Sequence, residues 1–236
     1  MGSTASLVGT VLDGKYQVAR LLGRGGMGEV YAGTHLQLER PVAIKVLHGG
    51  LGADESFVQR FQREARTAAR LEHPNAVHVY DFGSLEDGSA YLVMEFIEGV
   101  TLREVQRRNP RFPLAAVLDL MRQACAAVGA AHARGIVHRD LKPENMMVRT
   151  DETGRAVLKV VDFGLAKILE NQTSQLSNQS ELIGTPKYMA PEQFSGERID
   201  ERVDVYALGC ILFGLVTSRT PFEGTFVEVV GKHVYA

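Results

Sequence analysis

"HRDLKPEN" (residues 138–145) is the most specific stretch of the sequence. It follows an alanine-rich segment and Gly135, a residue typical of helix ends, so we expect it on a loop. There Asp140 can accept a proton from an attacking hydroxyl, Lys142 can stabilise a transferring phosphoryl group, and Asn145 offers an amide oxygen that suits magnesium. A turn alone would also account for Asp140 and Asn145, but it would not require an acid, a base and an amide in such close order.

Three glycines near the start of the chain, Gly23, Gly25 and Gly28, have G-x-G-x-x-G spacing. This spacing occurs in hairpin turns and in dinucleotide-binding folds, and alone it is weak evidence. A dinucleotide fold needs a helix after the third glycine, whereas the following "EVYAGTH" is β-like and Pro41 would interrupt a helix. We therefore predict a glycine loop between two strands, whose backbone N–H groups can point at phosphates.

Lys45 lies in "VAIKVL", an alternating stretch that predicts a strand. An exposed strand lysine is the default interpretation. Glu64, however, lies three residues after Phe61 and four before Ala68, on the apolar face of a predicted helix. A carboxylate on a buried face needs a partner because an unpaired buried charge is costly, so we expect Glu64 to pair with Lys45. A Glu64 exposed at the edge of the stripe is the alternative.

The expected elements come in a characteristic order. Three glycine-broken strands lie within residues 16–47, an amphipathic helix follows at about 54–73, and a hairpin with an Asp-Gly turn comes next. Longer helices are expected at 114–134 and at 203–216, the second too short to span a bilayer. Strands with one helix, followed mostly by helices, indicate an α+β fold in two unequal lobes.

The composition excludes several classes of function. With 45% hydrophobic residues, 23% charged residues and a net charge of −2, the 236-residue chain has no basic surplus that would favour nucleic acid or an anionic membrane. Cys125 and Cys210 lie far apart in apolar helical stretches, which predicts reduced core thiols and a cytoplasmic location. The first residues lack a secretory signal, and residues 1–13 are expected to be a flexible leader.

Taken together, the motifs resemble those of the protein kinase family, most closely the eukaryotic-like Ser/Thr kinases of bacteria. The resemblance covers nearly everything from about residue 16 to the end. It implies a bilobal kinase fold, with an antiparallel sheet and one helix in an N-lobe of residues 14–94, a hinge at 95–99 and a mostly helical C-lobe at 100–236. Six motifs carry it: "GRGGMGEV", "VAIK", Glu64, "HRDLKPEN", "DFG" at 162–164 and "APE" at 190–192.

The resemblance implies an ATP site between the lobes, with magnesium held by Asn145 and Asp162. Lys45, paired with Glu64, would contact the α- and β-phosphates, and Asp140 would orient the substrate hydroxyl. The other residues implied at the nucleotide belong to the glycine loop, to the two sides of the adenine ring and to the hinge region: Gly23, Gly25, Gly28, Val30, Ala43, Met147, Met94, Glu95 and Ile97.

The tripeptide Asp-Phe-Gly occurs twice, beginning at Asp81 and at Asp162. By the resemblance, the copy that holds the metal follows the catalytic loop, which assigns it to Asp162. Asp81 lies in a predicted strand of the first lobe. We interpret its copy as a strand that ends in a glycine turn.

Two motifs bear on the acceptor and on regulation. Lys142, together with Thr185 in "GTPKY", matches the pattern of Ser/Thr-specific members, so the implied activity is ATP-dependent phosphorylation of protein serine or threonine. Arg139 implies control by activation-loop phosphorylation, and self-association would allow this reaction in trans. The candidate acceptors in the loop are Thr173, Ser174, Ser177 and Ser180.

The resemblance also bears on three residues outside the nucleotide site. Asp204 would anchor the backbone of the catalytic loop. His138 would be a packing residue rather than a base. Tyr206 stands where many relatives carry tryptophan.

One departure from the family concerns the end of the chain. Members usually continue for several helices after "TPFEG", and these include an arginine that pairs with the position of Glu192. The present sequence stops at Ala236, so a fragment with an incomplete C-lobe is expected. Two rival functions follow. A catalytically silent kinase-like scaffold would bind nucleotide or a partner without transferring phosphate. A small-molecule phosphotransferase of related fold is disfavoured because it would not need the peptide-docking segment "GTPKYMAPEQ".

Overall fold

The computed structural model describes residues 7–25, 28–47, 55–109, 112–164, 186–195 and 199–235. Contacts divide the chain into two compact units. The first consists of Met1–Arg70 and His78–Ile97, and the second of Leu71–Val77 and Glu98–Ala236. Thr185 and the four predicted phosphate acceptors lie outside the described residues.

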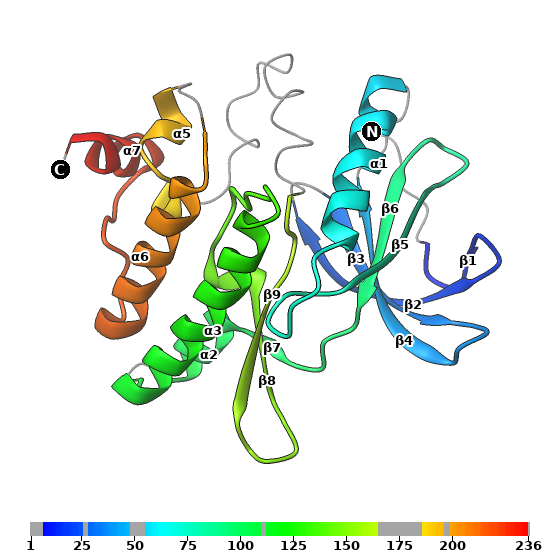
Figure 1. Cartoon of the computed structure of the whole chain (residues 1–236), viewed down its shortest axis with the longest axis horizontal. Coiled ribbons are helices and arrows are strands. Elements are labelled where there is room, and N and C mark those ends of the chain that lie inside the picture. Colours follow the sequence, from blue (N-terminus) through cyan, green and yellow to red (C-terminus); the bar gives the residue numbers. More distant parts are fainter. Residues whose placement is uncertain are drawn as a thin grey trace. The chain divides into compact units, whose positions relative to one another are not determined.

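The first unit contains a six-stranded antiparallel sheet in the order β1-β2-β3-β4-β6-β5 (Figure 1). Its strands are β1 Val11–Leu12, β2 Tyr16–Gly25, β3 Gly28–His35, β4 Arg40–Leu47, β5 Val79–Ser84 and β6 Ala90–Glu95. Strands β2, β3 and β4 pair in sequence, which confirms the predicted meander. The predicted Asp-Gly hairpin joins β5 to β6, where Gly88 has a φ of 82° and the Leu85 N–H donates to the Ser89 carbonyl at 2.7 Å.

Strand β1 lies within the segment expected to be a flexible leader. Val11 and Leu12 pair with Gln17 and Tyr16 of β2. Leu12 is only 6% exposed because it packs into the apolar cluster on this sheet. These residues therefore belong to the folded unit rather than to a leader.

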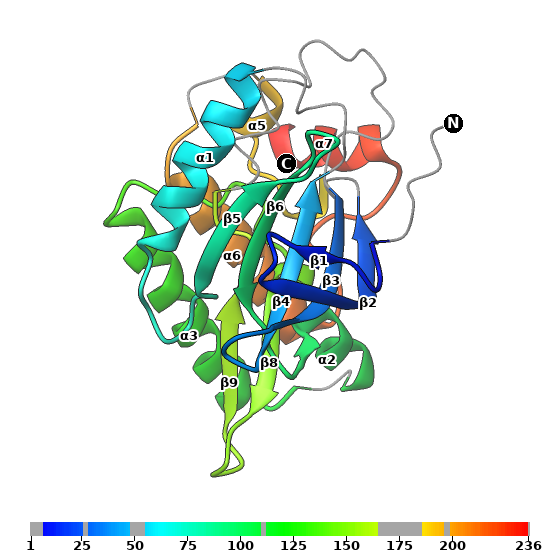
Figure 2. The ribbon, with the colours of Figure 1, turned by 90° about the vertical axis from the view of Figure 1, so that its right-hand side faces the viewer.

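Helix α1, Glu55–Ala69, packs against β5 and β6 (Figure 2). Phe61, Ala65 and Ala68 are buried and recur at three- and four-residue steps. The Phe61 ring meets the Phe82 ring of β5 edge to face, with centroids 6.2 Å apart. The predicted apolar stripe is thus the helix face that contacts the sheet.

The second unit is mostly helical, with a small sheet in the order β7-β8-β9. Its helices are α2 Leu102–Arg108, α3 Leu114–His132, α5 Glu192–Ser195, α6 Arg202–Thr217 and α7 Phe226–Tyr235. Its strands are β7 Val100–Thr101, β8 Met146–Thr150 and β9 Ala156–Val160, and its short 3-10 turns are η1 Pro143–Asn145 and η2 Pro186–Tyr188. Strands and helices follow the order expected from the sequence.

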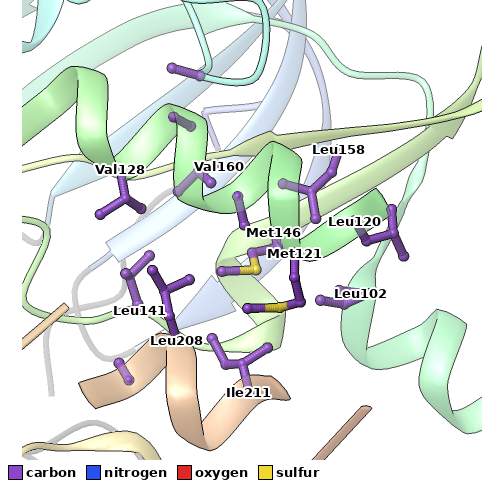
Figure 3. Packing of buried hydrophobic residues seen from close by; sticks show 14 of the residues in the cluster. Leu102, Leu120, Met121, Val128, Leu141, Met146, Leu158, Val160, Leu208 and Ile211 are labelled. Atoms are coloured by element: carbon purple, nitrogen blue, oxygen red, sulfur yellow. The ribbon is translucent and has the colours of Figure 1, made fainter. Parts of the chain in front are cut away.

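The core of this unit lies where α3, α6 and the β8–β9 hairpin meet (Figure 3). Ile211 of α6, Met146 of β8 and Leu158 of β9 are 0% exposed. Leu141, the central apolar residue of "HRDLKPEN", is 2% exposed and belongs to the same cluster. Burial of Leu141 therefore fixes the middle of the loop to the core, at a typical gain of about 1.5–3 kcal/mol for a leucine side chain.

Helix α3 is long and apolar enough to cross a membrane by length and composition. One face of it, including Ala124, Ala127 and Val128, is buried in the core, so we interpret it as a core helix. Cys125 lies on the opposite face and is exposed, whereas Cys210 of α6 is buried. The prediction that both cysteines are core thiols is therefore wrong for Cys125.

Candidate active site

The loop of residues 138–145 brings its three predicted polar side chains together around one carboxylate. Lys142 Nζ lies 3.0 Å from Oδ1 and 2.8 Å from Oδ2 of Asp140. Asn145 Nδ2 donates to the backbone oxygen of Asp140 at 2.8 Å and approaches Oδ2 at 3.2 Å. The side chains of Asp140 and Lys142 are 19% and 20% exposed, so solvent or a substrate can reach the carboxylate.

The orientation of the Asn145 amide determines what it can bind. Because the Asp140 backbone oxygen only accepts hydrogen bonds, the amide nitrogen must face it. The amide oxygen is then the atom that a cation could use. Carboxylate and amide oxygens suit magnesium, so Asn145 and Asp162 fit the predicted ion by their chemistry.

Asp162 follows the chain segment that Asn145 holds. The backbone oxygen of Asn145 accepts a hydrogen bond from the Val161 N–H at 3.0 Å. Asp162 has a φ of 66°, a left-handed conformation that is uncommon for a residue with a side chain. Within the described residues no group of three or more His, Cys, Asp or Glu could hold a metal alone. An ion at Asn145 and Asp162 would therefore need phosphate or water oxygens as further ligands.

Asp204 of α6 holds the backbone at the start of the loop. Its carboxylate, in a residue that is 1% exposed, accepts the Arg139 N–H through Oδ1 and the His138 N–H through Oδ2, each at 2.8 Å. Oδ2 also lies 2.7 Å from His132 Nε2 of α3. These bonds confirm the predicted anchoring role.

His138 is a packing residue, as predicted. It is 1% exposed, and its ring meets the Phe163 ring with centroids 5.1 Å apart. Its Nε2 lies 2.8 Å from the Val161 carbonyl oxygen, and its Nδ1 accepts the Asp140 N–H at 3.3 Å. Both ring nitrogens are thus engaged with the backbone on either side of the loop.

A small hollow lined in part by Asp140 and Lys142 lies within the second unit. Tyr188 and Met189, at and just after η2, form one wall, and Gln193 of α5 forms another. Burial raises the pKa of Tyr188 to about 12, so its hydroxyl keeps its proton at neutral pH. The full lining is Arg139, Asp140, Leu141, Lys142, Tyr188, Met189, Gln193, Val203 and Ala207.

Glycine is needed at Gly28 for a different reason than at Gly23 and Gly25. Gly28 has a φ of 147°, and a Cβ there would lie 2.0 Å from the Val46 carbonyl oxygen, so the approach of β4 requires glycine. Among the described residues, none has an atom within 4 Å of a Cβ at Gly23 or Gly25. The described part of the chain therefore does not require glycine at these two positions, whereas a ligand lying close to the backbone would.

Four predicted nucleotide contacts share one face of the sheet. Ala43 and Lys45 are two residues apart on β4, and their paired neighbours are Met94 of β6 and Val30 of β3. Residues two apart on a strand, and residues directly opposite on paired strands, point to the same face. Ala43 is 8% and Met94 5% exposed.

Lys45 is 5% exposed, which excludes the alternative of an exposed strand lysine. Glu64 lies half-buried on α1, and its pairing with Lys45 stays a prediction. Glu95 ends β6 and Ile97 follows it, whereas Met147 lies on β8 of the second unit.

Three comparisons with known proteins agree with one another. A family described as "Protein kinase domain" matches residues 16–234. Serine/threonine-protein kinase pkn3 of Myxococcus xanthus is 42% identical over 98% of this chain and 43% of its own length. Serine/threonine-protein kinase PrkC of Bacillus subtilis is 41% identical over 98% of this chain and 35% of its own length. The chain thus spans less than half of these relatives.

A solved structure is similar along most of the chain. The crystal structure of a mutant PknI kinase domain from Mycobacterium tuberculosis matches with a TM-score of 0.73 and 31% identity. The match covers 93% of this chain and 81% of that one.

Proposed function

The chain belongs to the protein kinase domain family, and from this membership we propose that it transfers the γ-phosphoryl group of ATP to serine or threonine hydroxyls of protein substrates. The observation that carries the proposal is the arrangement at Asp140, where Lys142 and Asn145 fix a solvent-accessible carboxylate. Asp140 and Lys142 also line a small hollow in this unit. Such an arrangement suits a base that orients a hydroxyl.

The site residues of the second unit then have distinct tasks. The Asp140 carboxylate orients the attacking hydroxyl and accepts its proton as the new O–P bond forms and the bond to ADP breaks. Lys142 lies at the Asp140 carboxylate, where its ammonium can stabilise the charge of the transferring group. Asn145 and Asp162 supply oxygen ligands for magnesium, which when bound neutralises phosphate charge.

The first unit supplies contacts to the nucleotide. Lys45 has an ammonium that suits the α- and β-phosphates, and its burial on the face shared with Ala43 and Met94 supports this role. The space over Gly23 and Gly25 that no described residue fills supports a close approach of the phosphates to the backbone. Protein catalysis here is mostly positioning and charge stabilisation.

Mass spectrometry after incubation with Mg-ATP tests the proposal. The purified protein should acquire phosphate on serine or threonine, and it should phosphorylate a generic protein substrate. Asp140→Asn should lower the rate by at least about 100-fold, because it removes the group that accepts the proton. Nucleotide binding without transfer by the wild-type protein would instead identify a silent scaffold.

A further inference from the structure

Gln193 bridges two backbone groups that are far apart in sequence. Its Nε2 donates to the Arg139 carbonyl at 2.9 Å, and its Oε1 accepts the Ala190 N–H at 3.0 Å. One of these partners can only accept and the other can only donate, so the orientation of the amide is fixed. Only a side chain with a donor and an acceptor at this reach satisfies both.

The held carbonyl belongs to a strained residue. Arg139 has a φ of 67°, a conformation that costs on the order of 1–3 kcal/mol and persists only when surrounding groups enforce it. Asp204 holds its N–H at 2.8 Å and Gln193 holds its carbonyl at 2.9 Å. Two side chains from different helices therefore fix both ends of this one residue.

The same carbonyl belongs to the peptide plane that leads into the base. The Arg139 C=O and the Asp140 N–H lie in one planar unit because the peptide bond does not rotate. Gln193 holds the oxygen side of this plane, and His138 Nδ1 accepts from its nitrogen side at 3.3 Å. Fixing the plane fixes the position of the Asp140 Cα, the atom from which its side chain extends.

We propose that Gln193 is a positioning residue for phosphoryl transfer, which sets Asp140 through the Arg139 carbonyl. The same Gln193 amide also accepts the Ala190 N–H. Ala190 directly follows Tyr188 and Met189, which form one wall of the hollow. The orientation of Asp140 thus depends on where Tyr188 and Met189 lie. The inference rests on the proposed kinase function and deepens it.

Three variants separate positioning from simple support of the fold. Gln193→Glu keeps the size and the acceptor for the Ala190 N–H, but an ionised carboxylate cannot donate to the Arg139 carbonyl. Gln193→Met keeps the length and removes both hydrogen bonds. Ser195→Ala, at an exposed position of the same short helix, is the matched control.

Steady-state kinetics from pH 8 to 5.5 give the first readout. At pH 8, Gln193→Glu and Gln193→Met should lower kcat about tenfold while KM for ATP changes less than about twofold. The introduced carboxyl group of Gln193→Glu would be partly buried against the Arg139 carbonyl oxygen, which raises its pKa above the usual value of about 4.3. As the pH falls, it therefore takes up a proton and regains a donor. Its kcat relative to wild type should therefore recover, while that of Gln193→Met stays low. Ser195→Ala should match wild type throughout.

Hydrogen exchange gives a second readout that needs no activity. At pH 8, the amides of residues 139–141 should exchange about fivefold faster in Gln193→Glu than in wild type or Ser195→Ala. Thermal unfolding identifies which variants are folded, and Gln193→Met replaces Gln193→Glu in the exchange comparison if the latter does not fold.

The outcomes are distinguishable. Active wild type with unimpaired Gln193→Glu and Gln193→Met overturns the inference and leaves the proposed function standing. Inactive wild type overturns the proposed function, and exchange then decides whether Gln193 holds the loop. Unchanged exchange in the folded variants overturns the inference in either case.

Discussion

The hydroxyl of Tyr16 donates a hydrogen bond to Oδ2 of Asp81 at 2.9 Å. Asp81 Oδ1 accepts the Phe82 N–H at 2.9 Å, and Lys15 Nζ lies 3.6 Å from Oδ2. Burial and the bond to Asp81 raise the pKa of Tyr16 above its ordinary value, so the hydroxyl remains a donor. The first Asp-Phe-Gly is therefore a structural motif, whose carboxylate joins the start of β2 to β5.

The same substitution in the two Asp-Phe-Gly copies should have very different effects on phosphoryl transfer. Asp162→Asn should lower phosphoryl transfer by at least about 100-fold, or about 3 kcal/mol in the barrier, because it removes a proposed metal ligand. Asp81→Asn should leave the rate within a few-fold and cost on the order of 1 kcal/mol of stability. Phosphate incorporation and urea unfolding measure the two effects. Equal loss of activity in both variants contradicts the assignment.

The glycine of the first Asp-Phe-Gly, Gly83, meets a steric requirement of the sheet. A Cβ at Gly83 would lie 2.5 Å from the Tyr91 hydroxyl oxygen and 2.6 Å from Cζ, and Tyr91 is 0% exposed. Gly83→Ala should therefore destabilise the protein by about 1–3 kcal/mol. Gly129→Ala in α3, where a Cβ meets no atom within 4 Å, should stabilise it by about 0.5–1 kcal/mol. Urea midpoints that shift in the same direction for both contradict this reasoning.

Local sequence patterns predicted much of the fold and site. Alternation and glycine breaks are local properties, so they predicted β2, β3 and β4 correctly. The spacing within "HRDLKPEN" likewise placed Asp140 and Lys142 together. Lys45 was more difficult, because the strand pattern cannot tell whether a face of the sheet is covered.

The interactions that the sequence did not predict join distant segments. Gln193 contacts the carbonyl of Arg139, 54 residues away, and Tyr16 contacts Asp81, 65 residues away. Their residue types are ordinary in a helix and in a strand, so no spacing marks them. Strand β1 was missed for a similar reason, since Val11 and Leu12 are too short a run to show alternation.

The buried carboxylate of Asp204 should be sensitive to loss of its charge. In Asp204→Asn an amide NH2 would face either the Arg139 or the His138 N–H, leaving a buried donor without an acceptor. We expect a loss of about 2–4 kcal/mol in the free energy of unfolding and at least about a tenfold fall in kcat. Asp200→Asn, which weakens the exposed pair with Arg202, should cost less than about 1 kcal/mol. Similar losses in the two variants contradict the anchoring role.

His233 of α7 should contribute to acid sensitivity of the fold. It is 5% exposed, its Nδ1 lies 2.7 Å from the Tyr206 hydroxyl oxygen, and the Phe222 ring meets it edge to face at 4.8 Å. Burial lowers the pKa of His233 below its ordinary value, although the backbone of Pro186 and Lys187 opposes this.

The sign of the pH effect follows from that direction. Above the unfolded pKa of about 6.5 the imidazole is neutral in both states, so it imposes no penalty. As the pH falls below this value the unfolded chain binds the proton more readily, and stability is lost progressively through the lower folded pKa. Urea unfolding at pH 7.5 and 5.5 should therefore show a smaller acid loss for His233→Gln than for wild type. Tyr206→Phe, which keeps the titrating ring, should retain the wild-type loss, and equal losses in wild type and His233→Gln would show that protonation of His233 does not destabilise the fold.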